Sequence, residues 1–170
     1  MKSFGPPPAQ GLYDPANEHD ACGFGFVVDV KARPSHDIVR KAMQVLSNLE
    51  HRGATGSEKN TGDGAGLLSQ IPHAFVSRWA KASGVELPPP GDYGLGMLFL
   101  PVESASRHAC QRKIEEIVAA EGQRVLCWRD VPTDSASLGA TARASQPVIR
   151  QLLVARGEGT ETGDAFERKL

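Results

Sequence analysis

The sequence has few aromatic residues and few cysteines. Phe, Trp and Tyr together make up 6% of the 170 residues, and the three cysteines, Cys22, Cys110 and Cys127, lie far apart along the chain. An odd number of widely spaced cysteines is a poor disulfide framework, and the chain has no CxxC pair of the kind that binds zinc. Most single cysteines are small buried hydrophobic residues. We therefore expect Cys110 and Cys127 to be packing residues, and we expect no metal site in this chain.

The sequence also lacks a charge excess and a long apolar run. The 19 Lys and Arg residues nearly balance the 20 Asp and Glu residues, which gives a net charge of −1. A nucleic-acid-binding domain normally has a basic excess or a basic stripe. No apolar run approaches the roughly 20 residues of a membrane span, and the N-terminal residues do not form a secretory signal. We expect a cytoplasmic protein that binds neither nucleic acid nor membrane.

The composition is that of a globular protein, because 40% of the residues are hydrophobic and 23% are charged. The amino-acid composition nevertheless changes along the chain. Residues 1–21 are polar, contain three consecutive prolines and show no periodicity, so they resemble an extended leader. The composition changes abruptly at Cys22, where a short apolar run begins.

From that point, patterns typical of strands and helices alternate. Apolar runs rich in β-branched and aromatic residues predict strands at 23–30, 67–71, 93–100, 123–131 and 147–155. Helical spacing of apolar residues predicts helices over about fourteen residues after Ser35, at 74–83, at 103–121 and at 164–170. Ser35 or Asp37 is a candidate N-cap of the first helix, and Asp164 of the last. The fold class is therefore α/β or α+β.

Residues 51–66 form a glycine-rich loop with five glycines in sixteen positions. Such loops often bind phosphate, but a Walker loop requires a Gly-Lys pair and the chain has none. A dinucleotide loop leads from a strand into a helix, whereas Gly23 and Gly25 lie at the start of a predicted strand. The glycines at 62, 64 and 66 likewise precede a predicted strand. The pattern does not indicate a nucleotide site, and without other information a mobile surface loop is the simplest interpretation.

Cys22 lies where the polar leader meets the first predicted strand. A thiol with a pKa of about 8.5 is mostly protonated at neutral pH and needs a base to become a nucleophile. The α-amino group of the same residue can be that base, because its pKa is close to neutral. This solution requires cleavage between Ala21 and Cys22. The adjacent Gly23 would let a substrate approach the backbone closely.

Several ordered motifs resemble one family. They are 12–15 (LYDP), 18–25 (EHDACGFG), 49–54 (LEHRGA), 61–66 (TGDGAG), 128–132 (WRDVP), 138–139 (LG), 142–143 (AR), 146–151 (QPVIRQ) and 166–170 (FERKL). Together they are similar to the N-terminal part of the glutamate synthase large subunit and, more distantly, to class II glutamine amidotransferases. The resemblance extends from about residue 12 to residue 170.

The resemblance implies a fold and a reaction. The fold is the four-layer αββα sandwich of N-terminal-nucleophile hydrolases, an α+β fold, with residues 1–21 as a propeptide and residues 22–170 as the N-terminal part of the amidotransferase domain. Cys22, freed by propeptide removal, would attack the side-chain amide of L-glutamine. The released ammonia would be used to make L-glutamate from 2-oxoglutarate in the full-length enzyme.

The resemblance also implies roles for residues near Cys22. Gly23, Arg52 and Gly53 are expected close to the nucleophile, where a fixed cation would favour the thiolate. Arg52 could instead hold loop carbonyls. Thr61, Gly62, Asp63 and Gly64 are candidates for the substrate loop. His51 is expected to be a packing or loop residue, because the α-amine already acts as the base.

The chain departs from the family pattern in one respect. Family members build the oxyanion hole from an Asn-Gly pair, but Asn17, Asn48 and Asn60 do not precede glycine. We therefore expect the domain to be truncated and the isolated chain to be inactive. We expect no cofactor within this segment, while the full-length subunit would carry FMN and an iron–sulfur cluster. The expected partners are the remaining domains of the large subunit and a small NADPH-oxidising subunit.

Two alternatives remain open at this point. One is a stand-alone amidohydrolase with the same nucleophile, against which the missing Asn-Gly pair argues. The other is a non-catalytic regulatory module of the same fold, against which the retained Cys-Gly and His-Arg-Gly motifs argue. The sequence does not distinguish NADPH, NADH and ferredoxin as electron donor.

Overall fold

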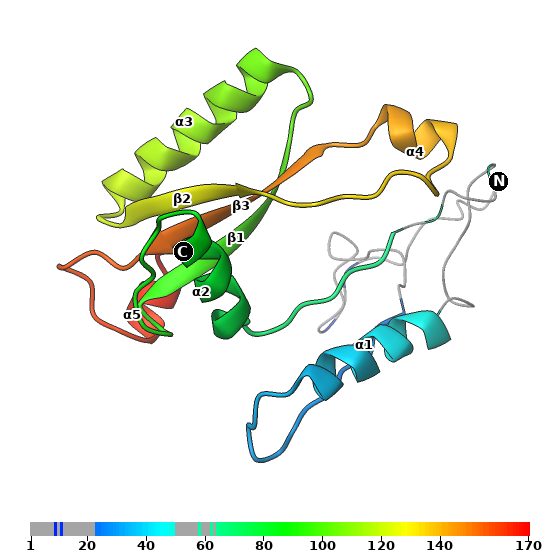
Figure 1. Cartoon of the computed structure of the whole chain (residues 1–170), viewed down its shortest axis with the longest axis horizontal. Helices are drawn as coiled ribbons and strands as arrows, with labels where there is room; N and C mark the ends of the chain where they lie inside the picture. Colours follow the sequence, from blue (N-terminus) through cyan, green and yellow to red (C-terminus); the bar gives the residue numbers. More distant parts are fainter. Residues whose placement is uncertain (1–8, 10, 12–22, 50–57, 59–61, 63) are drawn as a thin grey trace. The chain divides into compact units, whose positions relative to one another are not determined.

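A computed structural model describes residues 9, 11, 23–49, 58, 62 and 64–170 (Figure 1). The chain divides into two compact units. The first comprises Met1–Ala54 and Gly62–Leu67, and the second comprises Thr55–Thr61 and Leu68–Leu170. The predicted leader and most of the glycine-rich loop lie outside the described residues.

The first unit contains helix α1 (His36–Asn48), which confirms the helix expected after Ser35. The Ser35 hydroxyl accepts a hydrogen bond from the Asp37 amide at 3.1 Å, so Ser35 is the N-cap and Asp37 lies in the first turn. The apolar positions with helical spacing share one half-buried face; they are Ile38, Ala42, Val45, Leu46 and Leu49. The period of the sequence therefore correctly identified the packing face of α1.

The strand predicted at 23–30 is absent from the described residues. The segment is extended but unpaired, and alternate side chains point to solvent: Phe24, Phe26, Val28 and Val30 are 88%, 83%, 69% and 98% exposed. A strand needs a hydrogen-bonded neighbour, and the described residues provide none for this segment. The prediction was wrong because an alternating pattern identifies an apolar face but not the partner that would cover it.

The strand predicted at 67–71 is also wrong. Residues 67–71 have no regular secondary structure, and Leu68 is 99% exposed. The apolar residues of this short run extend toward the start of the next helix without a strand partner among the described residues. Periodicity over five residues cannot distinguish such a segment from a strand.

The second unit is built on a three-stranded antiparallel sheet in the order β1-β3-β2. The strands are β1 (Tyr93–Leu100), β2 (Arg124–Asp130) and β3 (Val148–Ala155), which confirms three predicted strands. Tyr93 pairs with Ala155 and Leu100 with Val148 across one side of β3. On the other side, Arg124 pairs with Ala155 and Asp130 with Arg150, and an irregularity lies between Val125 and Cys127.

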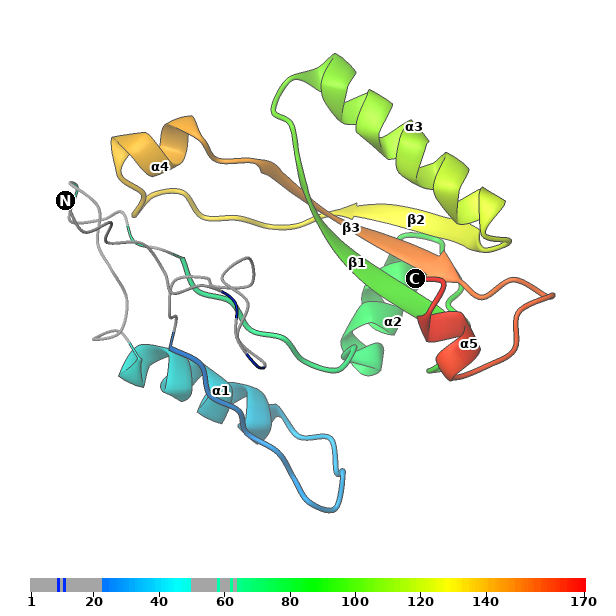
Figure 2. The same cartoon turned by 180° about the vertical axis from the view of Figure 1, so that it is seen from behind.

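Two helices cover opposite faces of this sheet (Figures 1 and 2). Helix α3 (Ser104–Ala120) connects β1 to β2 and lies over the face with Gly94, Gly96 and Leu152. Helix α2 (His73–Ala82) packs on the face that carries Tyr93 and Leu153. Successive residues of a strand point to opposite faces, so each helix takes alternate positions of β1 and β3.

The core of the second unit lies between α2 and the sheet. Val76, Tyr93 and Leu153 form its buried cluster, and Leu153 is fully inaccessible. The partly buried residues packed around them are Trp79, Leu87, Leu95, Leu126 and Cys127. Cys127 is therefore a packing residue, as expected. Cys110 is also a partly buried free thiol, on α3.

The helix ends follow local chemistry. Gly84 after α2 and Gly122 after α3 adopt φ of 74° and 73°, the left-handed conformation typical of a glycine that ends a helix. Helix α4 (Ala140–Ala144) lies in the loop between β2 and β3 and was not predicted. The last helix, α5 (Asp164–Glu167), begins at Asp164 itself, so this residue is inside the helix.

The α+β class is confirmed; the described residues contain one sheet, and the two-sheet sandwich remains a prediction.

Candidate functional site

The sequence placed the candidate site at Cys22 and two later segments. Of those residues, the structure describes Gly23, Gly62 and Gly64, while Cys22, Arg52, Gly53, Thr61 and Asp63 lie outside the described residues. Gly64 has φ of 90°, a conformation that side chains disfavour, which explains a glycine at this position. The distances that would join these residues into one site therefore stay predictions.

Gly23 begins the extended segment that leads into α1, and this segment lies directly against the helix. A Cβ built on Gly25 would lie 2.6 Å from Cγ1 of Val45. Real Cβ atoms essentially never approach a neighbour so closely, so a side chain at position 25 would require Val45 to shift. The Gly-x-Gly pattern after Cys22 is thus explained in part by close backbone packing on α1, not by phosphate binding.

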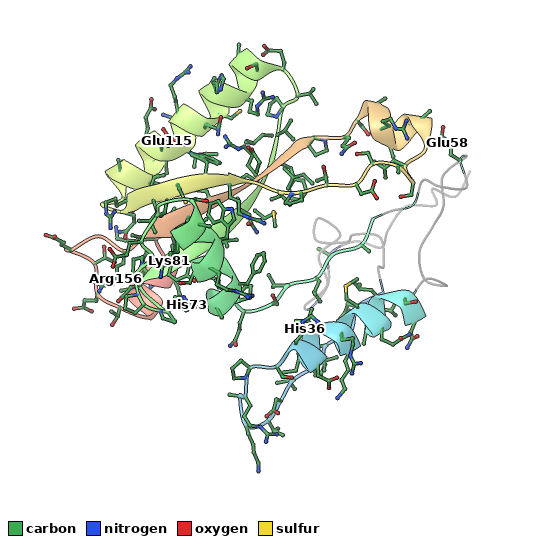
Figure 3. The ribbon with its side chains drawn as sticks, viewed as in Figure 1. His36, Glu58, His73, Lys81, Glu115 and Arg156 are labelled. Atoms are coloured by element: carbon green, nitrogen blue, oxygen red, sulfur yellow. The ribbon has the colours of Figure 1, made fainter. Side chains whose placement is uncertain are left out.

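Glu58 is a described residue of the glycine-rich loop, and its carboxylate contacts helix α4. Its Oε2 accepts a hydrogen bond at 3.2 Å from the amide of Thr141, 83 residues away in sequence (Figure 3). Sequence reasoning missed this residue because a contact at such separation leaves no local pattern. The one available signal was the motif Leu138-Gly139, in which the position preceding α4 has no side chain to cap the helix.

The segment around α4 is held by its own hydrogen bonds. Arg143 donates from Nη2 to the carbonyl oxygens of Ser135 and Leu138, at 3.1 and 3.2 Å. The Ser135 hydroxyl donates to Oε1 of Gln146 at 2.8 Å. Several of these residues belong to the LG, AR and QPVIRQ motifs. Residues 135–146, which include α4, are therefore held by their own hydrogen bonds, and Glu58 contacts this segment at Thr141.

The WRDVP motif supplies side chains to both faces of the sheet. Arg129 points to the α2 face, where its guanidinium lies 5.6 Å from the Phe75 ring and 5.4 Å from the Trp79 ring. It also donates to Oε1 of Gln151 at 2.7 Å. A guanidinium close to two aromatic rings is attracted to both, and a lysine ammonium could not stack in the same way. Arg129 therefore joins α2 to β2 and β3.

The neighbouring positions Trp128 and Asp130 point to the α3 face. The Trp128 indole donates to Oε1 of Glu115 on α3 at 2.6 Å, and its ring lies 5.5 Å from the guanidinium of Arg150. Arg150 Nε lies 2.6 Å from Oδ1 of Asp130, as an ion pair without good hydrogen-bond direction. These contacts hold α3 to the sheet and point to a structural role for the motif.

Two titratable groups belong to the core, the buried Tyr93 and the partly buried Cys127. The Tyr93 hydroxyl lies 3.0 Å from Nδ1 of His73, at the start of α2 (Figure 3). Burial raises the pKa of Tyr93 and also the pKa of the Cys127 thiol, because both charged forms are disfavoured away from water. Its packing against the core fits the structural role expected for Cys127.

A cavity of about 290 Å³ lies between α3 and the sheet. Its lining is mostly apolar and includes Gly94, Gly96, Ile114, Ile117 and Leu170. A glutamine site needs polar groups that converge on the amide and on the α-amino and α-carboxyl groups. The polar lining residues are Glu121, Gln123 and Lys169, and they already bond within the protein: Lys169 pairs with Glu121 at 2.9 Å, and Gln123 bonds to Thr160 and Gly157. We therefore do not place the glutamine site there.

Within the part of the chain that the structure describes, no three His, Cys, Asp or Glu side chains group as metal ligands. In the same residues, every helix is too short or too polar to cross a membrane.

Comparison with known proteins identifies the family. The model for class II glutamine amidotransferases matches residues 22–170, which is most of the chain. The chain therefore belongs to the class II glutamine amidotransferases.

Its curated relatives are glutamate synthases. The chain is 42% identical over 164 residues to the glutamate synthase [NADPH] large chain of Bacillus subtilis, covering 96% of this chain and 11% of that protein. It is 39% identical to ferredoxin-dependent glutamate synthase 2 of Synechocystis, covering 90% of this chain and 10% of that protein. It is 42% identical to the glutamate synthase [NADH] of Saccharomyces cerevisiae, covering 87% and 7%. The chain thus spans about a tenth of the length of these relatives.

Proposed function

We propose that this chain is the glutaminase part of a glutamate synthase large subunit and that Cys22 is its nucleophile. One observation carries the proposal: the family match begins at Cys22, and relatives with 36–42% identity over most of the chain are glutamate synthases. The same match supports residues 1–21 as a removable propeptide and residues 22–170 as part of the amidotransferase domain. The sandwich fold of N-terminal-nucleophile hydrolases is part of this proposal.

The proposed reaction has two steps. The Cys22 thiolate attacks the side-chain carbonyl carbon of glutamine, and the C–N bond breaks as ammonia leaves with a proton from the Cys22 α-ammonium group. Water then attacks the thioester, which returns the thiol and releases glutamate. Both steps need a free α-amine near neutral pKa, so the uncleaved chain, in which that nitrogen is an amide, lacks the base.

Arg52, with Gly53, is proposed to lie beside Cys22, where its fixed positive charge stabilises the thiolate. Gly23 leaves space for the substrate next to the nucleophile. Thr61, Gly62, Asp63 and Gly64 are proposed to form the loop that contacts glutamine.

The rest of the overall reaction is assigned to parts of the protein outside these 170 residues. We propose that the ammonia passes to a second site that uses FMN and an iron–sulfur cluster to make glutamate from 2-oxoglutarate. The remaining domains, and a small NADPH-oxidising subunit, are the proposed partners in a cytoplasmic enzyme.

The test uses the protein as its gene encodes it. Intact mass should show loss of residues 1–21, and the glutamine-like electrophile 6-diazo-5-oxo-L-norleucine should label Cys22. Cys22→Ser should abolish both the labelling and the release of ammonia from glutamine. Cys110→Ser is the matched control, because Cys110 is a partly buried free thiol on α3, and it should retain both.

Other outcomes would identify the alternatives. Ammonia release without any glutamate formation from 2-oxoglutarate would indicate a stand-alone amidohydrolase. An uncleaved chain that is not labelled at Cys22 would indicate a regulatory module and would overturn the proposal.

A further inference from the structure

The sheet face beneath α3 is only partly covered. Helix α3 packs mainly against β2, and two glycines of β1, Gly94 and Gly96, place no side chain on this face, so the cavity of about 290 Å³ remains there. Ile114, Ile117 and Val118 of α3 line its other side. Ile117 is 52% exposed although it lines the cavity. An exposed apolar side chain beside an apolar cavity marks a surface that a further group can cover.

Leu170 already fills one end of this cavity (Figure 2). A Cβ built on Gly94 would lie 2.5 Å from Cδ1 and 2.9 Å from Cδ2 of Leu170, so the leucine side chain lies directly on Gly94. The preceding residues fix this position. Phe166 is buried, and Nζ of Lys169 pairs with Oε2 of Glu121, at the end of α3, at 2.9 Å. Leu170 is therefore held on the sheet although its own surface is 61% exposed.

The other end of the cavity is open at Gly96. Gly94 is buried under Leu170, whereas Gly96 is exposed and a Cβ built on it meets nothing within 4 Å. The two glycines are two residues apart on one strand, which is about 6.6 Å. In an extended chain, the second residue after Leu170 would lie at the same spacing from Leu170. A side chain at that position is therefore within reach of the space over Gly96.

The lining favours an apolar side chain from the adjoining chain over a separate partner. Its only charged residues are Glu121 and Lys169, which pair with each other, so no free charge there selects a polar ligand. A group tethered through two residues has an effective concentration of roughly millimolar or more. A separate protein would instead lose its translational and rotational freedom on binding. The segment that follows Leu170 is thus the favoured occupant.

We infer that, in the full-length subunit, the segment directly after Leu170 lies along β1 and inserts an apolar side chain over Gly96, beneath α3. The inference rests on the proposed function, in which this chain is part of a longer large subunit. The inserted side chain would join the free side of α3 to β1. The next part of the subunit would therefore begin from a fixed point on this sheet.

Photo-crosslinking of the full-length subunit tests the contact directly. The crosslinking amino acid p-benzoyl-L-phenylalanine replaces Ile117, which lines the cavity and is half exposed. After irradiation and digestion, mass spectrometry should find residue 117 joined to the peptide that directly follows Leu170. The same probe at Arg112, an exposed position of α3 outside the cavity lining, is the control and should not give this product.

The other crosslinking outcomes overturn the inference. A product with a second copy of the chain, with another subunit or with a distant segment would identify a different occupant, and the absence of any product would mean that the cavity stays open. The result is also separable from the proposed function. A subunit labelled at Cys22 but lacking the crosslink would refute this inference alone. A crosslinked subunit that is neither cleaved before Cys22 nor labelled there would refute the proposed function and leave the contact standing.

A substitution that fills the space from β1 gives a second test. Gly96→Leu should displace the segment and speed trypsin cleavage after Lys169 in the full-length subunit about tenfold, because overpacking shifts the local opening equilibrium by roughly that factor. Gly159→Leu is the matched control, since a Cβ there also meets nothing within 4 Å, and it should leave the cleavage rate unchanged. An unchanged rate in Gly96→Leu would show that the space over Gly96 is empty. The crosslinking test remains valid even if Gly96→Leu does not fold.

Discussion

Gly157 packs directly on the backbone of Gly122, at the turn between α3 and β2. A methyl group on Gly157 would overlap the Gly122 carbonyl oxygen, far inside the 3.0 Å that real Cβ atoms keep. The Gly157 amide donates to Oε1 of Gln123 at 2.8 Å, and Nε2 of Gln123 donates to the Thr160 hydroxyl at 2.8 Å. This contact ties the loop after β3 to the end of α3.

Gly157→Ala should therefore destabilise the protein by about 3 kcal/mol, because rigid backbone on both sides cannot yield to the methyl group. The free energy of unfolding in urea measures the effect. Gly159→Ala is the matched control in the same loop: a Cβ there meets nothing within 4 Å. Equal stability of the two variants would contradict the packing described.

Gln123 is buried, with 6% of its surface exposed, and both ends of its amide are used. Gln123→Leu keeps the volume but leaves the Gly157 amide and the Thr160 hydroxyl without their partner. We expect a loss of about 3 kcal/mol, since each unsatisfied buried group costs about 1–3 kcal/mol. Gln70→Leu, at an exposed position, should change the unfolding free energy little. A Gln123→Leu protein as stable as the wild type would mean that water replaces the lost bonds.

Arg129 should not tolerate lysine. Arg129→Lys loses the stacking on Phe75 and Trp79 and weakens the bond to Gln151, at a cost of about 1–2 kcal/mol. Arg124→Lys, at an exposed position of the same strand, is the control. Chemical denaturation of both variants is the measurement, and an equal effect of the two substitutions would argue against the stack.

Glu103 should make stability depend on pH in the acidic range. Its carboxylate caps α3 by accepting from the amides of Ala105 and Ser106, and these bonds lower its pKa from 4.5 to about 2. A lowered pKa in the folded state stabilises the protein fully above pH 4.5 and progressively less as the pH falls toward 2. The stability advantage of the wild type over Glu103→Gln should therefore shrink across that range.

Thermal unfolding at a series of pH values tests this prediction. Glu116→Gln, which removes an exposed carboxylate on the same helix, serves as the control and should not show the same loss. An advantage of Glu103 that stays constant from neutral pH down to 2 would exclude the capping explanation.

Helices α1, α2 and α3 were predictable because their signals are local. Ser35 caps α1, and the left-handed glycines Gly84 and Gly122 follow α2 and α3, so each boundary is determined within a few residues. Strands β1, β2 and β3 were recognised from apolar runs between turn residues. The segment at 23–30 has an equally good pattern but pairs with no strand among the described residues. A strand depends on a neighbour, which sequence spacing does not identify.

In the candidate site, too, local sequence patterns do not identify contacts between distant segments. The role of Cys22 is inferred from its position after a polar leader and from the motifs around it, and it stays a prediction. The contact of Glu58 with Thr141 was not predicted, since it joins segments 83 residues apart. The missing side chain at Gly139 is meaningful only once its distant partner is known.

The order of the sheet has a consequence for synthesis of the protein. The central strand, β3, is the last of the three in the chain, and β1 and β2 each pair with it and not with each other. At roughly 5–20 residues per second, the apolar residues of β1 therefore wait several seconds on the ribosome before residue 155 is made. Until β3 has been synthesised, neither β1 nor β2 has a strand with which to pair. The growing chain should consequently need a chaperone that shields β1, and slower translation between β2 and β3 should lower the soluble yield.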